Sequence, residues 1–119
     1  MKKILIVDDQ AGIRLLLNEV FKKAGYETYL AANGLEAIRF LENIVMDCML
    51  LDMRIPGANG IQILKHLQKL GQKMPIIMMT AYGEQDLLDQ AKELGATHYF
   101  TKPFDIKELQ NTVNNLLED

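Results

Sequence analysis

Short strand-like runs alternate with helical segments along this 119-residue chain, and no other feature limits the fold as strongly. The strand-like runs are rich in β-branched, leucine and aromatic residues, and a helical pattern follows each of them; they lie at 3–7, 27–31, 48–51, 76–79 and 98–100. The first, third and fourth runs are apolar on both faces, which is typical of strands buried between two layers of helices. The alternation therefore predicts an α/β fold with a parallel sheet and right-handed crossovers.

The helical segments are recognisable by their ends and by their apolar faces. Asn33 and Asp105 are predicted N-caps, and Gly25 and Gly95 are predicted to end the helices that precede them. The first helix is expected to share one apolar face among Ile13, Leu16, Leu17, Val20, Phe21 and Ala24, and the second to turn inward Leu35, Ile38, Leu41 and Ile44. Five strands and five helices predict a doubly wound, flavodoxin-like sandwich, for which the strand order 2-1-3-4-5 is the leading candidate.

Length, charge and cysteine content exclude several classes of protein. The chain suits one domain, 1–119, which can bury a core without disulfides or metals. A formal net charge of -3 offers no basic excess to a nucleic acid. The single cysteine, Cys48, cannot form an internal disulfide, and no apolar stretch is long enough for a signal peptide or a membrane span. We expect a cytoplasmic protein that binds neither nucleic acid nor membrane.

Polar residues stand where the predicted strands end. Asp8 and Asp9 follow the first strand, Asp52 the third, Thr80 the fourth and Lys102 the fifth. In an open parallel sheet, ligands bind at the carboxyl ends of the strands near the point where the strand order reverses. These side chains are therefore predicted to meet in one acidic pocket that also holds a hydroxyl and an ammonium group.

The residue types in this pocket indicate phosphoryl chemistry. Three neighbouring carboxylates repel one another, and a hard divalent cation with oxygen ligands, Mg²⁺ or Mn²⁺, would compensate. A carboxylate can act as a covalent nucleophile toward a phosphoryl group. The cation and Lys102 would neutralise the charge on the transferred group, and Thr80 would donate a hydrogen bond to it.

Four segments of the chain resemble the signature segments of response-regulator receiver domains: ILIVDDQ, LLDMRIPGANG, MTAYG and TKPF. The resemblance implies the flavodoxin-like, CheY-like order 2-1-3-4-5. It also implies that Asp52 is the phosphorylated aspartate. Asp9, Asp52 and the backbone carbonyl of Arg54 would ligate the metal directly, with Asp8 acting through water.

The same resemblance assigns further roles around the pocket. Thr80 and Lys102 would contact the phosphoryl group, and Tyr99 would be the aromatic residue that turns inward when Thr80 moves. The Lys102–Pro103 peptide bond is expected to be cis. Arg54 and Tyr82 stand two residues past Asp52 and Thr80, where we expect them to screen an acyl phosphate from water.

A closer resemblance is to the stand-alone response regulators of the sporulation phosphorelay in spore-forming bacilli. It rests on the segments DDQ-GIR-LLNEVF, AANGL, LLDM-IPG, MTAYGE, KELGA and KPFDI. The resemblance implies a monomer that receives a phosphoryl group from a sensor histidine kinase and passes it to a histidine phosphotransferase, with a phosphatase as a further candidate partner. Ala11 and Tyr99 replace a tyrosine and a histidine of those proteins. The expected partner surface comprises Gln10, Ile13, Arg14, Leu17 and Tyr82.

Other functions remain open on the sequence. A chemotaxis-like output switch would use the same pocket but would bind a partner instead of passing the phosphoryl group on. An aspartate-nucleophile phosphatase needs a second acid two residues after the nucleophile, where this chain has Arg54. A flavodoxin needs a phosphate-binding loop where this chain has Asp8-Asp9-Gln10. A degenerate receiver would not keep all the pocket residues.

Overall fold

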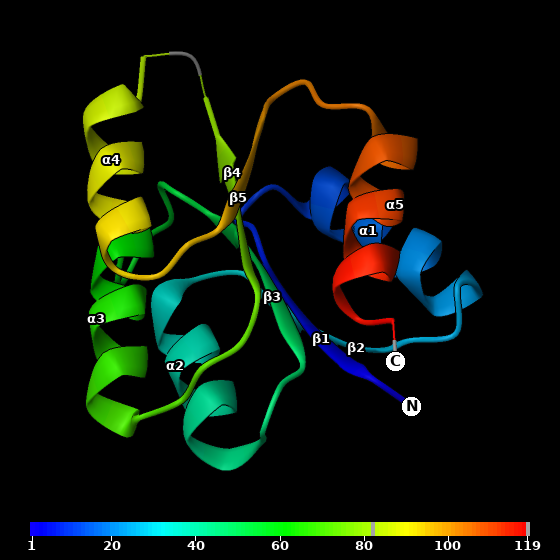
Figure 1. Cartoon of the computed structure of the whole chain (residues 1–119), viewed down its shortest axis with the longest axis horizontal. Helices are drawn as coiled ribbons and strands as arrows, with labels where there is room; N and C mark the ends of the chain where they lie inside the picture. Colours follow the sequence, from blue (N-terminus) through cyan, green and yellow to red (C-terminus); the bar gives the residue numbers. More distant parts are fainter. Residues whose placement is uncertain (82, 119) are drawn as a thin grey trace.

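The computed structural model describes residues 1–81 and 83–118, and these are built around one parallel sheet (Figure 1). Its strands are β1 (Lys3–Val7), β2 (Glu27–Ala31), β3 (Cys48–Asp52), β4 (Ile76–Thr80) and β5 (His98–Thr101). Their order is β2-β1-β3-β4-β5, and every neighbouring pair is parallel. The predicted strand order is confirmed, and the order reverses between β1 and β3.

In the described part of the chain, five helices cover the two faces of the sheet: α1 (Ala11–Lys23), α2 (Gly34–Asn43), α3 (Gly60–Leu70), α4 (Gln85–Glu93) and α5 (Ile106–Leu116). Figure 1 shows α1 and α5 on one face and α2, α3 and α4 on the other. The predicted three-layer sandwich is therefore confirmed. Among the described residues, no helix combines the length and the apolar character that crossing a membrane requires.

The sheet separates two apolar cores. Successive residues of a strand point to opposite faces, so Ile4 and Ile6 pack under α1 and α5, while Leu5 and Val7 pack under the other three helices. All five residues of β3 and of β4 are buried. Cys48 is part of this interior, and burial raises the pKa of its thiol to about 12.

Local signals for the helix ends are confirmed. The Asn33 side chain accepts a hydrogen bond from the Glu36 amide, and Asp105 accepts from the amides of Lys107 and Glu108. Gly25 and Gly95 follow α1 and α4 with φ angles of 97° and 107°, a left-handed region that glycine enters without strain.

Three residues predicted to face inward are exposed instead. Leu35 is 66% exposed because it lies almost opposite Ala37, which faces the sheet, on the α2 helical wheel. Leu16 is 49% exposed because the buried stripe of α1 is narrow and centred on Leu17 and Phe21. Ala24 is the C-cap residue of α1 and is exposed. The predicted apolar faces were too wide.

The loop between β3 and α3 is held in place by the start of α2. The Gly34 amide donates to the carbonyl oxygen of Pro56 at 2.8 Å, and a Cβ atom at Gly34 would collide with the backbone of Ala58. Contact this close between two main chains requires glycine. It fixes the path of the chain directly after Asp52, which ends β3.

Candidate functional site

Three carboxylates meet where β1 and β3 end. Asp52 is the last residue of β3, and Asp8 and Asp9 directly follow β1. Asp8 and Asp52 are buried, whereas Asp9 is exposed. One oxygen atom from each carboxylate lies within 4.8 Å of those of the other two. The predicted meeting of the three carboxylates is therefore confirmed, whereas no described hydrogen bond joins the Thr80 hydroxyl to them.

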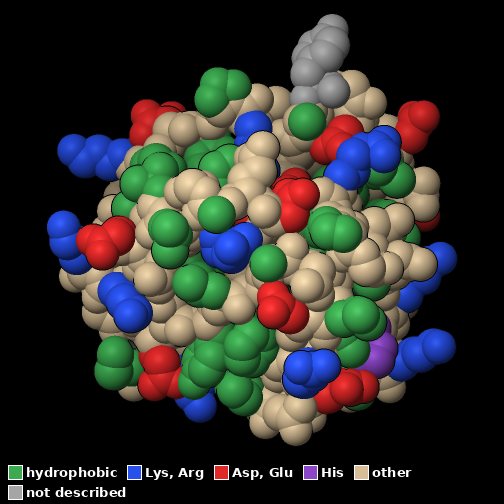
Figure 2. All heavy atoms as spheres, turned by 180° about the vertical axis from the view of Figure 1, so that it is seen from behind, with side chains coloured by type: hydrophobic (Ala, Val, Ile, Leu, Met, Phe, Trp, Pro, Cys, Tyr) green, Lys and Arg blue, Asp and Glu red, His purple; other side chains and the backbone are tan. Residues whose placement is uncertain are grey.

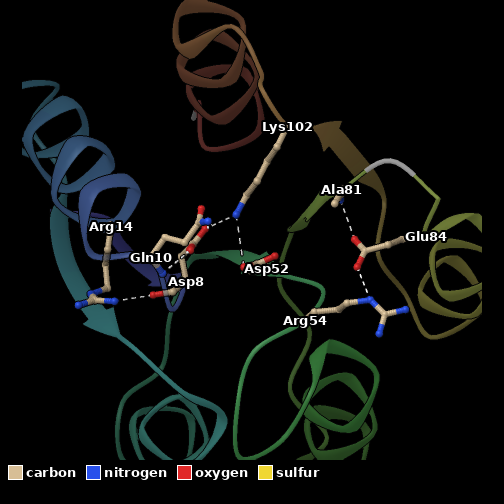
Figure 3. Close-up of polar contacts among 8 residues, drawn as sticks. All are labelled: Asp8, Gln10, Arg14, Asp52, Arg54, Ala81, Glu84 and Lys102. Carbon is tan, nitrogen blue, oxygen red and sulfur yellow. Dashed lines mark hydrogen bonds and ion pairs between the residues drawn. The ribbon is translucent and has the colours of Figure 1, made fainter.

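Asp8 is the most firmly held of the three. Its amide donates to the Ala31 carbonyl oxygen at 3.1 Å, and its Oδ1 accepts from the Gln10 amide at 2.9 Å. Arg14 reaches back from α1, and its Nη1 donates to the Asp8 carbonyl oxygen at 2.7 Å (Figure 3). These contacts hold Asp8 against the end of β2 and the start of α1, and its Oδ2 atom points into the pocket.

Lys102 supplies the positive charge of the pocket. Its Nζ donates to Asp8 Oδ2 at 2.8 Å and to Asp52 Oδ2 at 3.3 Å (Figure 3). Its amide donates to the carbonyl oxygen of Thr80 at 2.8 Å, and this hydrogen bond positions Lys102 beside the end of β4. The Lys102–Pro103 peptide bond is cis, as expected.

Burial and charge raise the pKa of Asp52. Removal of the carboxylate from water is the main cause, and repulsion by Asp8 adds to it, so that the pKa reaches about 6 even though Lys102 opposes the change. Burial alone would lower the pKa of Lys102. Its hydrogen bond to Asp8 and its attraction to Asp52 outweigh that effect and raise the pKa above the ordinary value. Lys102 is therefore held in its charged form.

The pocket fits a hard divalent cation by its donor set. Carboxylate oxygens are the ligands that Mg²⁺ takes in proteins, usually with water completing the shell. One ammonium faces two of the three carboxylates, so the pocket keeps excess negative charge. Asp9 lines a surface hollow together with Arg54 and Asn59, which gives the cluster an open side. Asp8, Asp9 and Asp52 are the residues that could hold the ion.

Thr80 is buried at the end of β4, beside a polar contact that sequence reasoning missed. Glu84 Oε1 accepts from the Ala81 amide at 2.6 Å, and Glu84 Oε2 pairs with Arg54 Nε at 2.5 Å (Figure 3). The Glu84 side chain is 6% exposed, whereas that of Arg54 is 70% exposed. The only sequence signal for Glu84 was its place near the start of a helix, which is common for surface acids as well.

The predicted screening pair is placed only in part. Tyr82 lies outside the described residues. The guanidinium of Arg54 pairs with Glu84, and no described ion pair joins it to Asp52. A role of its backbone carbonyl as a metal ligand stays a prediction.

Tyr99 lies on β5, beyond the carboxylate cluster. The residue is 50% exposed, and its ring lies under the ammonium group of Lys92, 4.7 Å from Nζ to the ring centroid. It lines a hollow with Thr80, Glu84 and Leu88. The inward turn of Tyr99 stays a prediction. The hollow lies directly beside the Tyr99 side chain.

The expected partner surface needs one correction. Leu17 is fully buried against the sheet, so it cannot be an exposed docking residue. Leu16, one residue earlier, is exposed and lines a mainly apolar hollow with Gln10, Ile13, Lys102, Pro103, Phe104 and Ile106. Figure 2 shows apolar side chains gathered in several groups on the face seen from behind. Arg14 is engaged with the Asp8 backbone.

Comparison with known proteins gives consistent matches. The sequence model of the response regulator receiver domain family matches residues 4–114 of this chain. Sporulation initiation phosphotransferase F of Bacillus subtilis is 53% identical over 98% of this chain and 94% of its own length. The chemotaxis protein CheY of Thermotoga maritima is 34% identical over 97% of each chain. A solved CheY-like receiver domain protein of Methanospirillum hungatei is 30% identical, with a TM-score of 0.91 over 97% of this chain and 92% of its own.

Some relatives are longer. This chain spans between 26% and 48% of the length of three other matching regulators, so the matched region is one part of those proteins. The family match covers more than half of the chain, and the fold and the strand order agree with it. The chain belongs to the response regulator receiver domain family.

Proposed function

We propose that residues 1–119 act as one receiver unit that accepts a phosphoryl group on Asp52 and relays it to a histidine phosphotransferase. The observation that carries the proposal is the cluster in which Lys102 Nζ lies 2.8 Å from Asp8 and 3.3 Å from Asp52, with Asp9 beside them. This arrangement combines a nucleophilic carboxylate with groups that neutralise a phosphoryl anion.

In the proposed reaction, an Asp52 carboxylate oxygen attacks phosphorus in a phosphohistidine. A new P–O bond forms, the P–N bond breaks, and the released imidazole takes up a proton. Lys102 stabilises negative charge on the phosphoryl oxygens, and the Thr80 hydroxyl donates a hydrogen bond to one of them. Because Asp52 ends β3, which lies between β1 and β4, and pairs with Met79 of β4, little reorganisation is needed to align it.

Mg²⁺ or Mn²⁺ is proposed as the resident ion, held by Asp8, Asp9 and Asp52. When bound, it would offset the repulsion between the carboxylates and the incoming phosphoryl group. Burial is the main cause of the raised pKa of Asp52, and repulsion by Asp8 and Asp9 adds to it, so a bound cation would favour the ionised carboxylate. Asp52 must be ionised to act as a nucleophile.

The relay role is supported by the relative named sporulation initiation phosphotransferase F, which shares 53% identity with this chain. The proposed donor is a sensor histidine kinase, and a phosphatase would be a third partner. The chain has Arg54 where an aspartate-nucleophile phosphatase needs its second acid. We therefore propose a signalling monomer in the cytoplasm and no turnover of small phosphate esters.

The test begins with acetyl phosphate as a small donor. With Mg²⁺, the wild-type protein is expected to gain one phosphoryl group by intact-protein mass spectrometry, and Asp52→Asn is expected to gain none, because its amide is not a nucleophile. Chelation of Mg²⁺ should stop labelling of the wild type. Equal labelling of Asp52→Asn would reject the assigned acceptor.

The second stage separates relay from output. Phosphorylated protein is mixed with a histidine phosphotransferase of a spore-forming bacillus, and transfer of the label to that protein is followed over time. Transfer supports the relay. Retention of the label, with tighter binding of another protein, would favour the chemotaxis-like output switch. The similarity to CheY of Thermotoga maritima supports that alternative.

A further inference from the structure

Glu84 is a buried carboxylate that the proposed phosphoryl reaction does not use. It lies just before α4, with a side chain only 6% exposed. A buried carboxylate is costly unless hydrogen bonds and opposite charge compensate for its lost water. Its described partners are the amide of Ala81 and the guanidinium of Arg54.

Both partners lie next to the proposed acceptor. Arg54 is two residues after Asp52, and Ala81 directly follows Thr80 at the end of β4. Asp52 pairs in register with Met79, so the chain reaches Ala81 two residues beyond the strand position beside Asp52. In Figure 3 the main chain of Ala81 and the side chain of Arg54 converge on Glu84, with Asp52 on their other side.

A phosphoryl group on Asp52 would present oxygens to these same donors. Backbone amides and arginine side chains are strong hydrogen-bond donors to phosphoryl oxygens. An amide N–H that is donated to Glu84 at 2.6 Å is not available to another acceptor at the same time. The carboxylate of Glu84 and the phosphoryl group therefore compete for the same donors.

We propose that Glu84 is a positioning residue that acts as an internal competitor: in the unphosphorylated protein its carboxylate holds the Ala81 amide and Arg54, and phosphorylation of Asp52 displaces it. This inference rests on the proposed phosphorylation of Asp52. Once displaced, Glu84 has lost the groups that made its burial tolerable, so it moves toward water. The start of α4 moves with it, which couples the site to that surface.

The decisive variant is Glu84→Gln, which keeps the shape of the side chain but removes its charge. The probe is beryllofluoride with Mg²⁺, a stable mimic of the acyl phosphate, and its dissociation constant is measured by calorimetry. We expect Glu84→Gln to bind about ten-fold more tightly than the wild type, a coupling of ordinary size for two linked sites. Initial rates of labelling by acetyl phosphate should rise in parallel.

Glu93→Gln is the matched control, because Glu93 is an exposed acid at the other end of α4. Its dissociation constant should equal that of the wild type. Equal or weaker binding by Glu84→Gln would overturn the inference, since a purely structural Glu84 would give that result. If the wild type itself does not bind beryllofluoride, the proposed function fails and the inference with it.

A second measurement covers the case in which Glu84→Gln does not fold. In the wild type, the NMR resonances of the Glu84 side-chain carboxyl carbon and the Arg54 Nε–H group are followed while beryllofluoride is added. Displacement predicts that both resonances shift as the site is filled. Unchanged resonances at saturation would show that the contact persists and would overturn the inference.

Discussion

The ionised side chain of Asp52 lowers the stability of the folded protein. Its burial and the nearby Asp8 raise its pKa from 3.8 to about 6. In the unfolded chain neither effect acts, so the folded protein binds a proton at Asp52 more tightly than the unfolded protein does. Above pH 6 the ionised residue therefore reduces the free energy of unfolding, and this reduction disappears as the pH falls below about 4.

We expect Asp52→Asn to raise the free energy of unfolding of the metal-free protein at pH 7.5 by about 1 to 3 kcal/mol. The gain arises because the amide carries no charge to desolvate and none for Asp8 to repel. Urea unfolding at several pH values measures it. The difference between variant and wild type should shrink as the pH is lowered from 6 to 4.

Glu19→Gln is a suitable control, since Glu19 is exposed on α1 and its pair with Lys23 is 3.9 Å long. Its effect should be small at every pH. Mg²⁺ should narrow the gap between the wild type and Asp52→Asn, because the ion stabilises the ionised carboxylate. An equal difference in the free energy of unfolding between Asp52→Asn and the wild type at pH 4 and at pH 7.5 would contradict the explanation.

The positions of acidic residues at the strand ends predicted the acidic cluster, but nothing in the sequence predicted the contacts of Glu84. The cluster follows from one rule, that parallel strands bring their carboxyl ends to one edge, and Asp8, Asp52 and Lys102 stand at such ends. The pairing of Glu84 with Arg54 depends on how two loops approach each other. No periodicity in the sequence encodes the relative path of loops.

Among the elements, the strands were predicted almost to the residue and the helix faces were not. The strands β3, β4 and β5 extend one residue further than expected, which makes Asp52 and Thr80 the last residues of their strands. The strand patterns are short and bounded by polar residues, so the sequence limits where each strand can begin and end. Which side of a helix is buried depends on how the helix packs against the sheet, and the sequence alone does not give this orientation. Leu16 and Leu35 are exposed for this reason.

The contact between α2 and the loop after β3 gives a prediction at this scale. Gly34→Ala should lower the free energy of unfolding by about 1 to 3 kcal/mol, the usual cost of forcing an extra methyl group into a packed contact. Its Cβ would meet the backbone of Ala58, which cannot rotate away. Thermal and urea unfolding measure the loss.

Gly12→Ala provides the matched comparison. Gly12 lies in α1, where a Cβ atom would come within 4 Å of no described group apart from the adjacent residues and the backbone of the helix itself. Alanine there should stabilise the helix by about 0.5 to 1 kcal/mol. Opposite signs for the two variants would attribute the loss to the contact. A stabilising Gly34→Ala would show that α2 can move away freely.

The whole molecule places an apolar hollow beside its acidic centre. Leu16 and Ile13 of α1 and Pro103 and Phe104 after β5 line this hollow, and Lys102 belongs to both. We expect a partner helix that brings a histidine to Asp52 to cover this surface, because apolar side chains in a groove are common anchors for helices.

We expect Leu16→Gln to slow phosphotransfer to a histidine phosphotransferase by about ten-fold, as truncation of a central interface side chain does. Labelling by acetyl phosphate should not change, because the small donor needs no docking surface. Leu35 is also exposed but lies on α2, away from the hollow, so Leu35→Gln should change neither rate. Equal slowing by both variants would argue against a localised docking surface.

The two hydrogen bonds of Lys102 also carry a consequence for the growing chain. They join residues 94 and 50 positions apart in the sequence, and the lysine comes after the last strand of the sheet. During synthesis the ribosome therefore releases the acidic residues well before the cation that pairs with them. An unfinished chain carries Asp52 but not the lysine that pairs with it, so we expect the proposed phosphoryl transfer only after the unit of β5 and α5 has joined the sheet.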